Sequence, residues 1–534
     1  LIPTVKASIR QSSIDRTIPH AITYLYALSR GGMNMLEIFR SISMHVHIYG
    51  AAAEEFSYIV RDMEYLNCDL LTALKNASNR TPSEKFKDFI DGLISITSTG
   101  GDTTAFLKSK ADQYQYVAVR EQKSFLDTLG VLAEVYISVF VVGPLFLITI
   151  LVVLGLIGTG ATDIVYVVVY GIIPISTIIY LLILQIVSGA HGKSPKLYIT
   201  KKRLNIFDDV PTKKLSDDES ESKLFKRLEY YGTITRFIDK VTHPIRMMRE
   251  NAKYSLAISI PIGIIYLAYV ASVRGFVIGN IFPIHFDIGI ISSIDDHIII
   301  SVFIMLIPFI IFYEMNVRRI RQIEDMLPEF LKRLASINEA GILLIDAIAM
   351  IADSKIGILR NEIRRVSKDI SWGSSTAAAL TKLEFRIRTD ITTRIMTLIV
   401  KASESTSDVR SVLNIAASDA DVQKQLKDAR SAEMFVYVFI VYVAFFVFLF
   451  IVYVLSAFFL PSIPSSTGDA VAGMPMIASF DIEEYTLLLF HAAVIQGFCS
   501  GLVAGQMGSG SALAGLKHSV IMVIFSYATF TILI

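Results

Sequence analysis

The sequence predicts an all-α, polytopic membrane protein with about seven transmembrane helices and two homologous helical-bundle domains in the cytoplasm. Three observations lead to this fold class. The chain of 534 residues is 53% hydrophobic and only 19% charged, whereas soluble domains carry about 25% charged residues. The apolar residues gather in long uncharged blocks, which is typical of spanning helices. Two of the polar segments between these blocks share one residue pattern.

The apolar blocks divide the chain into membrane and polar parts, because a spanning helix needs about 20 apolar residues. Seven blocks qualify, at 131–157, 164–187, 255–273, 297–315, 434–460, 484–506 and 518–534. In chain order we predict a first cytoplasmic helical domain (1–130), transmembrane helices 1–2 (131–187), a basic cytoplasmic loop or linker (188–253), transmembrane helices 3–4 (254–315), a second cytoplasmic helical domain (316–433) and transmembrane helices 5–7 (434–534).

The basic residues indicate the orientation of these spans. With residues 1–130 placed inside, one basic residue, Arg274, falls on the outer side, and the other 49 of the 50 Lys and Arg fall inside. This distribution follows the positive-inside rule. We therefore expect a multi-pass protein of the plasma membrane with its polar domains in the cytoplasm. The stretch 275–292 is apolar but broken by Gly, Asn, Pro and Asp, and we interpret it as an extracytoplasmic loop.

Helix signals are clear within both polar domains. The segment Thr81–Glu84 reads as a capping box with proline at the first helical position. The following helix should end near Gly100, as a glycine cap requires. The glycines at 32 and 341 interrupt helical patterns and predict a hairpin of two helices at each place. Prolines inside four of the predicted spans favour kinks; they are Pro144, Pro174, Pro261 and Pro308.

The two polar domains form an internal repeat. The pattern around Ile18-Pro19 recurs around Leu327-Pro328 at an offset of 309 residues, and later positions match at an offset of 306. A gap of three residues reconciles the two offsets. Because each domain is followed directly by an apolar block, the predicted repeat unit is a small antiparallel bundle plus a membrane anchor.

Several function classes lack their sequence signatures. The chain contains no GxxxxGK[ST] phosphate loop and no HExxH or paired-cysteine zinc pattern. Its two cysteines, Cys68 and Cys499, fall in a polar and an apolar block. We therefore predict no enzyme activity, no cofactor, no metal site and no nucleic-acid partner. An alternative function is that of a secondary transporter, but this class favours inverted repeats and polar residues at the bilayer midplane.

A family resemblance follows from two motifs. The run Ile18–Gly32 resembles the opening of the type II secretion system F domain, in the version found in archaeal pilus platform proteins of the TadC type. The tail from Gly501 through Ser519 resembles the C-terminal signature of the archaeal branch, which includes the archaellum platform. Bacterial members usually have three spans, so the seven predicted here point to the archaeal branch.

The resemblance implies a role and a set of partners. Such proteins are non-enzymatic inner-membrane platforms for assembling type IV pilus-like filaments, and they contact a hexameric secretion ATPase and pilin subunits within the lipid bilayer. Because of the opening run, we favour an adhesion pilus over an archaellum. The absence of a nucleotide-binding motif agrees with this interpretation, since the energy would come from a partner.

Basic residues of the second polar domain are the candidate docking site for that ATPase. They form two groups, Arg318, Arg319 and Arg321, and Arg360, Arg364, Arg365 and Lys368. The second group lies on one helix face and fits an acidic partner surface. It equally fits an ordinary solvated face, and the first group fits an anchor at the lipid headgroups.

A glycine series in the sixth span is the candidate packing site. Gly497, Gly501 and Gly505 form a double GxxxG pattern, which lets helices approach closely. This pattern fits either packing within the chain, which we favour, or a homodimer.

Overall fold

The protein is all-α over the residues that the structure describes, and seven of its helices there are long and apolar enough to cross a membrane. This confirms the predicted fold class of a polytopic helical membrane protein. The computed structural model describes residues 2–156, 162–192, 252–273, 288–406, 408–462 and 482–533, with scattered residues between 227 and 248. Most of the predicted basic loop, 188–253, therefore lies outside the described residues.

The helices form two compact units. The bundle unit includes Leu1–Phe125 and Arg319–Arg430, and the membrane unit includes Leu126–Gly189, Lys213–Arg318 and Ser431–Ile534. Long helices contribute residues to both units; they are α6 (Thr103–Val135), α13 (Ile288–Glu339) and α18 (Val409–Val454).

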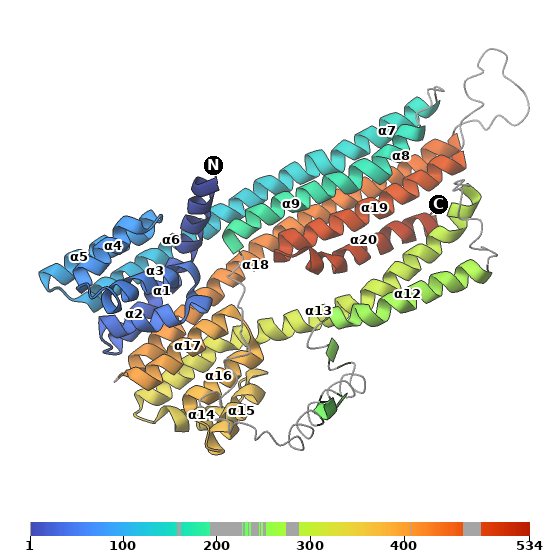
Figure 1. Ribbon diagram of the computed structural model, residues 1–534. Helices are drawn as coiled ribbons and strands as arrows, with labels where there is room; N and C mark the ends of the chain where they lie inside the picture. Colours follow the sequence, from blue (N-terminus) through green and yellow to red (C-terminus); the bar gives the residue numbers. More distant parts are fainter. Residues whose placement is uncertain are drawn as a thin grey trace, which may run out of the picture. The chain divides into compact units, whose positions relative to one another are not determined.

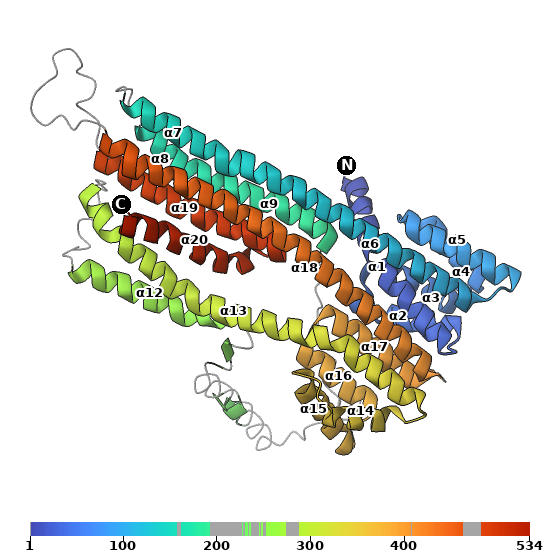
Figure 2. The same ribbon diagram turned by 180° about the vertical axis from the view of Figure 1, so that it is seen from behind.

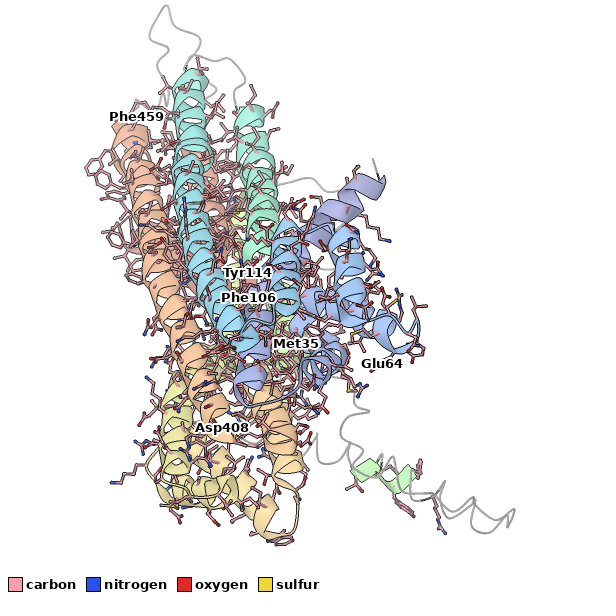
Figure 3. All side chains as sticks on the ribbon, turned by 90° about the vertical axis from the view of Figure 1, so that its left-hand side faces the viewer. Met35, Glu64, Phe106, Tyr114, Asp408 and Phe459 are labelled. Carbon is pink, nitrogen blue, oxygen red and sulfur yellow. The ribbon has the colours of Figure 1, made fainter. Side chains whose placement is uncertain are left out.

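The bundle unit holds two bundles with the same order of helices (Figure 1). The first bundle consists of α1 (Ile2–Arg30), α2 (Met35–Met44), α3 (Val46–Glu64), α4 (Leu70–Arg80), α5 (Glu84–Thr99) and the start of α6. The second bundle consists of the end of α13, α14 (Leu344–Asp353), α15 (Leu359–Ser371), α16 (Thr376–Ile387), α17 (Asp390–Ser405) and the start of α18. Figure 3 labels Met35 at the start of α2, Glu64 at the end of α3 and Asp408 just before α18.

Glycines separate the paired helices at equivalent places. Gly32 follows α1 with φ 87°, and Gly341 follows α13 with φ 84°. A residue with a side chain is strained at such angles, whereas glycine is not. The predicted helix breaks at these two glycines are confirmed.

The start of α5 differs by two residues from the prediction. The capping residue is Ser83, whose Oγ accepts a hydrogen bond from the Phe86 N–H at 3.1 Å, and the helix begins at Glu84. Pro82 precedes the helix, so the assignment of Thr81 as the cap was wrong. The predicted end is confirmed, since Gly100 caps α5 in the left-handed conformation.

Apolar side chains of both bundles join in one continuous core. Phe56 stacks at 5.3 Å from Phe39 and meets Phe86 edge-on at the same centroid distance. Each such fully buried side chain contributes about 1.5–3 kcal/mol. The bundles also share backbone contacts, because the Asp408 N–H donates to the Gly31 carbonyl at 3.3 Å.

The membrane unit contains the apolar spans, and Figure 2 shows them from the opposite side to Figure 1. Two regions are distinguished below. The hairpin consists of α12 (Lys253–Val273) and the start of α13. The core spans are the end of α6 with α7 (Gly143–Leu156), α8 (Thr162–Val167), α9 (Ile173–Gly192), the end of α18, α19 (Ile482–Ser509) and α20 (Ala512–Leu533).

Prolines in the core spans coincide with wide π-helical turns. One turn, Tyr136–Val142, ends two residues before Pro144, and another, Val168–Ile172, ends two residues before Pro174. A π-turn accommodates the backbone group that loses its hydrogen-bond donor at proline. In the hairpin, Pro261 lies within the continuous helix α12.

One prediction in the hairpin was wrong. Residues 288–292, interpreted as part of a loop, form the first turns of α13. The helix thus begins before the predicted span, which starts at 297. The polar pair Asp295-Asp296 interrupts the apolar sequence just before that span, but it does not interrupt the helical hydrogen bonds of the backbone. The rest of that predicted loop, 275–287, lies outside the described residues.

Candidate functional site

An exposed stripe of basic side chains runs along α15 in the second bundle. The side chains of Arg364 and Arg365 are 45% and 63% exposed, and Lys368 is also exposed. Ile358 and Trp372 extend the same face at its two ends, and Trp372 is 91% exposed. We call these five residues the α15 stripe. Arginine and tryptophan are the side chains that most often dominate the energy of protein interfaces.

The other predicted basic residues have different surroundings. Arg360 is only half-buried at the start of α15, so it adds less to the exposed surface. Arg318 belongs to the membrane unit, where its Nε donates to Glu314 at 3.2 Å. Arg319 reaches the carboxylate of Glu362 at 3.4 Å. Arg321 is exposed but takes part in a further contact.

Glu362 is a buried carboxylate surrounded by arginines. Its side chain is 7% exposed, and Arg386 in α16 donates to it at 3.0 Å. Arg319 from α13 and Arg365 from α15 lie within 3.5 Å of the same carboxylate. Arg386 also contacts Asp369 at 3.6 Å. These contacts join three helices of the second bundle through one charge network.

The first bundle contains a similar network with fewer direct contacts. Glu55 is completely buried, and Arg10 donates to it at 2.6 Å. Burial raises the pKa of the Glu55 carboxyl, while the charges of Arg10 and Arg80 lower it. Arg80 lies 4.0 Å from Asp62, which is also buried.

The two networks occupy equivalent positions of the repeat. Arg10, Glu55, Asp62 and Arg80 correspond to Arg319, Glu362, Asp369 and Arg386 at offsets of 309, 307, 307 and 306. The three-residue gap between the two copies, inferred from the sequence, therefore falls at two separate places. Two residues are lost before the buried glutamate and one after it, and Gly50 and Gly357 mark the first of these places with positive φ angles.

The α15 stripe itself is not repeated in the first bundle. Its counterparts there are Ala51, Ser57, Tyr58, Arg61 and Tyr65. The single cation among them, Arg61, pairs with Asp62 at 3.1 Å and lies 5.2 Å from the centre of the Tyr58 ring. The first bundle thus reaches the same fold without a basic stripe, so the fold does not require these cations.

Residues 21–151 and 330–457 match the family "Type II secretion system (T2SS), protein F". We call these two matching regions, which together cover a little under half of the chain, the F domains. Over 538 positions it is 23% identical to Uncharacterized protein MJ1286 of Methanocaldococcus jannaschii, an alignment that covers 99% of this chain and 81% of that protein. No solved structure matches the chain.

Both F domains extend from a bundle into a membrane span. The first match ends within α7 and the second within the turn Leu455–Phe459 that follows α18. The family unit is therefore a bundle joined to a spanning helix, and the predicted internal repeat is confirmed. Among the described residues, seven helices are long and apolar enough to cross a membrane, and two of them extend from the F domains.

The glycine series lies at the contact between α19 and α20. A Cβ atom at Gly501 would fall 2.1 Å from the backbone nitrogen of Ser519, and one at Gly505 would fall 1.9 Å from the Cα of Gly515. Only glycine permits so close an approach. At Gly497 a Cβ would meet the ring of Phe445 at 3.1 Å, which is a looser contact.

Polar side chains connect several spans of the membrane unit. His491 in α19 contacts Asp295 in α13 at 2.7 Å, and its other ring nitrogen contacts the hydroxyl of Tyr170. Lys517 in α20 contacts Glu314 in α13 at 3.0 Å. Ionisable groups within spans are costly unless paired. These pairs therefore stabilise the positions of the helices that carry them.

The described residues contain no cluster of three or more metal-binding side chains. Asp102, which follows two glycines in the sequence, is a helix cap whose Oδ1 accepts from the Thr104 N–H at 2.8 Å. Its counterpart in the second F domain is Asp408, which accepts from the Ser411 N–H at 3.1 Å. Both aspartates thus begin helices α6 and α18.

Sequence reasoning missed the buried networks and the exposed Trp372. A signal for the networks was present, since Arg10, Glu55 and Arg80 recur with nearly the same spacing in the second copy. The repeat pattern consists mainly of apolar positions, and the charges recur at offsets that differ between 309 and 306 residues, so they do not stand out in the sequence. For Trp372, the signal was its i+4 spacing from Lys368.

Proposed function

We propose that this protein is a non-enzymatic platform of the plasma membrane for assembling type IV pilus-like filaments. In this role it couples a hexameric secretion ATPase of the cytoplasm to pilin subunits in the bilayer. The duplicated F domain carries the proposal, because the family is described as a component of a secretion system. The relative from Methanocaldococcus jannaschii, aligned over nearly the whole chain, supports the archaeal branch, and the opening run Ile18–Gly32 favours an adhesion pilus over an archaellum.

The orientation follows from charge. The polar F domains carry most of the basic residues, and the positive-inside rule assigns such segments to the cytoplasm. In this orientation both bundles are accessible to a cytoplasmic motor. The α15 stripe is the surface we assign to the motor, since it is exposed, basic and absent from the first F domain.

Force passes to the membrane through continuous helices. The helix that begins at Thr103 continues to Gly155, and the helix that begins at Val409 continues to Ser462. Each starts in a bundle and includes an apolar span. A movement imposed on the bundles by the ATPase therefore shifts the attached spans, and these spans move a pilin relative to the bilayer.

Co-purification with the ATPase tests the proposal. The cleanest variant is Arg364→Glu with Lys368→Glu, because Arg365 also supports buried Glu362. We expect at least a tenfold loss of ATPase binding, because opposite charges at the centre of an interface become like charges. Binding is measured with the detergent-solubilised full chain and the purified ATPase.

The matched control places the same charge change in the first F domain. Lys75 and Lys108 are exposed there, and Lys75→Glu with Lys108→Glu should leave binding unchanged. Equal binding by both double variants would remove the α15 stripe as the docking surface. ATP hydrolysis by the purified chain alone would contradict the proposed function as a whole.

A further inference from the structure

The hairpin and the core spans of the membrane unit are packed very differently. In their most apolar stretches, 17% of the residues of α12 and of α13 are buried, against 28% in α20, 44% in the span of α18 and 61% in α19. Within the hairpin, however, the contacts are close. Ser301 in α13 donates to the carbonyl of Gly263 in α12 at 3.0 Å, and Ser259 donates to the carbonyl of Met305 at 2.8 Å. The hairpin is thus well packed internally and sparsely packed against its neighbours.

Polar contacts hold the hairpin to the core near both ends of its spanning segment. The first latch is the contact of Asp295 with His491, supported by Tyr170. The second latch is the contact of Glu314 with Lys517. Asp295 and Glu314 are nineteen positions apart on α13, which is about 28 Å along a helix. This distance is close to the hydrocarbon thickness of a bilayer, about 30 Å.

An apolar groove of about 460 Å³ lies between the hairpin and the core, in the region between the latches. Val302 and Phe303 of α13 form one wall, and Pro174 of α9 and Phe498 of α19 lie opposite. Almost all of its exposed lining is apolar. Lining atoms without a partner forfeit their dispersion contacts, so this groove favours an apolar occupant from the membrane.

We propose that the α12–α13 hairpin is a lateral gate, which opens the groove to the apolar spanning helix of a filament subunit. This inference rests on the proposed function, which supplies the class of partner. The hairpin has the properties that a gate needs, because it is rigid within itself, buries little surface against the core and is held by contacts that can break and reform. Opening separates both latches and widens the groove enough to admit a helix.

The arrangement favours a spanning helix over a lipid as the functional occupant. A lipid chain covers one leaflet, which is about half of the roughly 30 Å hydrocarbon thickness. The closed groove follows α13 only from Ile298 to Leu306, about 12 Å along the helix. The latches lie at opposite ends of the span, so releasing both would extend the groove to the length of a complete transmembrane helix. Releasing only one latch would suffice for a lipid chain, whereas a helix requires both.

Photo-cross-linking tests where the subunit binds. A benzoylphenylalanine replaces Phe303 in the groove wall, and the matched control replaces Phe450, which is 63% exposed on α18. The probe is an epitope-tagged filament subunit with an N-terminal apolar helix, expressed with the full chain. We expect at least tenfold more cross-linked subunit from position 303 than from position 450. A tagged single-span protein with a polyleucine helix should show no such preference.

Locking the gate tests the movement. In a chain with Cys68→Ser and Cys499→Ala, the pair Asp295→Cys and His491→Cys is joined by a methanethiosulfonate cross-linker. We expect the lock to remove most of the cross-link at position 303, and a reducing agent to restore it. Glu314→Cys with Lys517→Cys provides a second lock if the first variant does not fold. The control lock, Tyr442→Cys with His518→Cys, joins two core spans in contact at 2.9 Å and should have no effect.

The outcomes separate the gate from the proposed function. Equal cross-linking from positions 303 and 450, cross-linking of position 303 to lipid alone, or unchanged capture in both locked variants would overturn the gate. In each of these cases the ATPase should still co-purify, and the platform function stands. If the ATPase does not bind the unmodified chain, the proposed function fails first.

Discussion

The two F domains of this chain share their buried charges and differ in their exposed ones. Both hold a buried glutamate in contact with an arginine of a neighbouring helix, and in both an arginine at an equivalent position reaches a second acid. Only the second F domain presents a basic stripe that ends in an exposed tryptophan. The two copies therefore share contacts that hold the bundle together, while one outer face carries charges that the fold does not need.

The comparison also shows why the buried networks matter for the fold. A buried ion pair is weak evidence for added stability, because removing charges from water is costly. Its loss is nonetheless severe when one partner remains. The networks thus favour one pairing of helices over others, since another register would leave the buried glutamate without a cation.

The largest expected effect comes from removing a buried glutamate. Glu55→Ala and Glu362→Ala should each destabilise their bundle by about 1.5–3 kcal/mol, because the charged hydrogen bonds of the buried carboxylate are lost while the arginines stay partly solvated. Thermal unfolding of the detergent-solubilised chain measures the loss. We expect Glu362→Gln to be milder than Glu362→Ala, since the amide still accepts hydrogen bonds. A loss below about 1 kcal/mol, typical of an exposed pair, would show that the networks do not hold the bundles.

Replacing two residues of the α15 stripe by their counterparts from the first F domain separates the role of the stripe in binding from its role in stability. Arg364→Ser with Arg365→Tyr gives the second F domain the residues of the first, Ser57 and Tyr58. Stability should change by less than about 1 kcal/mol, because one arginine in a partly exposed pair with Glu362 is lost while two others remain. ATPase binding, measured by co-purification, should fall about tenfold, or about 1.4 kcal/mol. Unchanged binding would mean that the difference between the copies has no role in docking.

Helix caps should behave alike in the two copies. Ser83 caps α5 and Thr389 caps α17 at equivalent positions, and each accepts a hydrogen bond from the backbone three residues later. Ser83→Ala and Thr389→Ala should each cost about 1 kcal/mol. Chemical denaturation of the two variants measures whether these two losses of stability are equal. Each hydroxyl also donates a second hydrogen bond, Ser83 to Asp15 and Thr389 to Thr392. A clearly larger loss at Ser83 would identify the contact with the charged Asp15 as important for the first copy.

The smallest effect concerns pH at the contact between the copies. His20 lines a cavity of about 530 Å³. Its counterpart in the second copy, at the offset of 309 residues, is Glu329. Burial, with the charge of Arg394, holds the pKa of His20 well below its usual 6.5. The unfolded chain therefore binds the proton more readily, and stability should fall as the pH drops below about 6.5. His20→Gln should flatten this dependence in thermal unfolding between pH 5 and 7, and an unchanged slope would exclude His20 as its source.

The sequence by itself determined the membrane spans, the helical class, the duplication and several helix ends. These features depend on local quantities, such as the hydropathy of 20 consecutive residues or the left-handed backbone at Gly32 and Gly341. A match to two F domains confirms the duplication. Each of these signals is contained in a few neighbouring positions, so no knowledge of packing is needed to detect it.

Only the tertiary structure decided which charges are buried and which remain exposed. In the sequence, Arg319 and Arg364 look equivalent, yet packing directs Arg319 to the buried carboxylate of Glu362 and Arg364 to Asp353, whose side chain is 86% exposed. The same holds for the weakly packed hairpin, whose helices are as apolar as the spans of the core. The physical reason is that burial and pairing arise between residues far apart in the chain, as with Arg10 and Glu55, and such contacts depend on how the helices pack together.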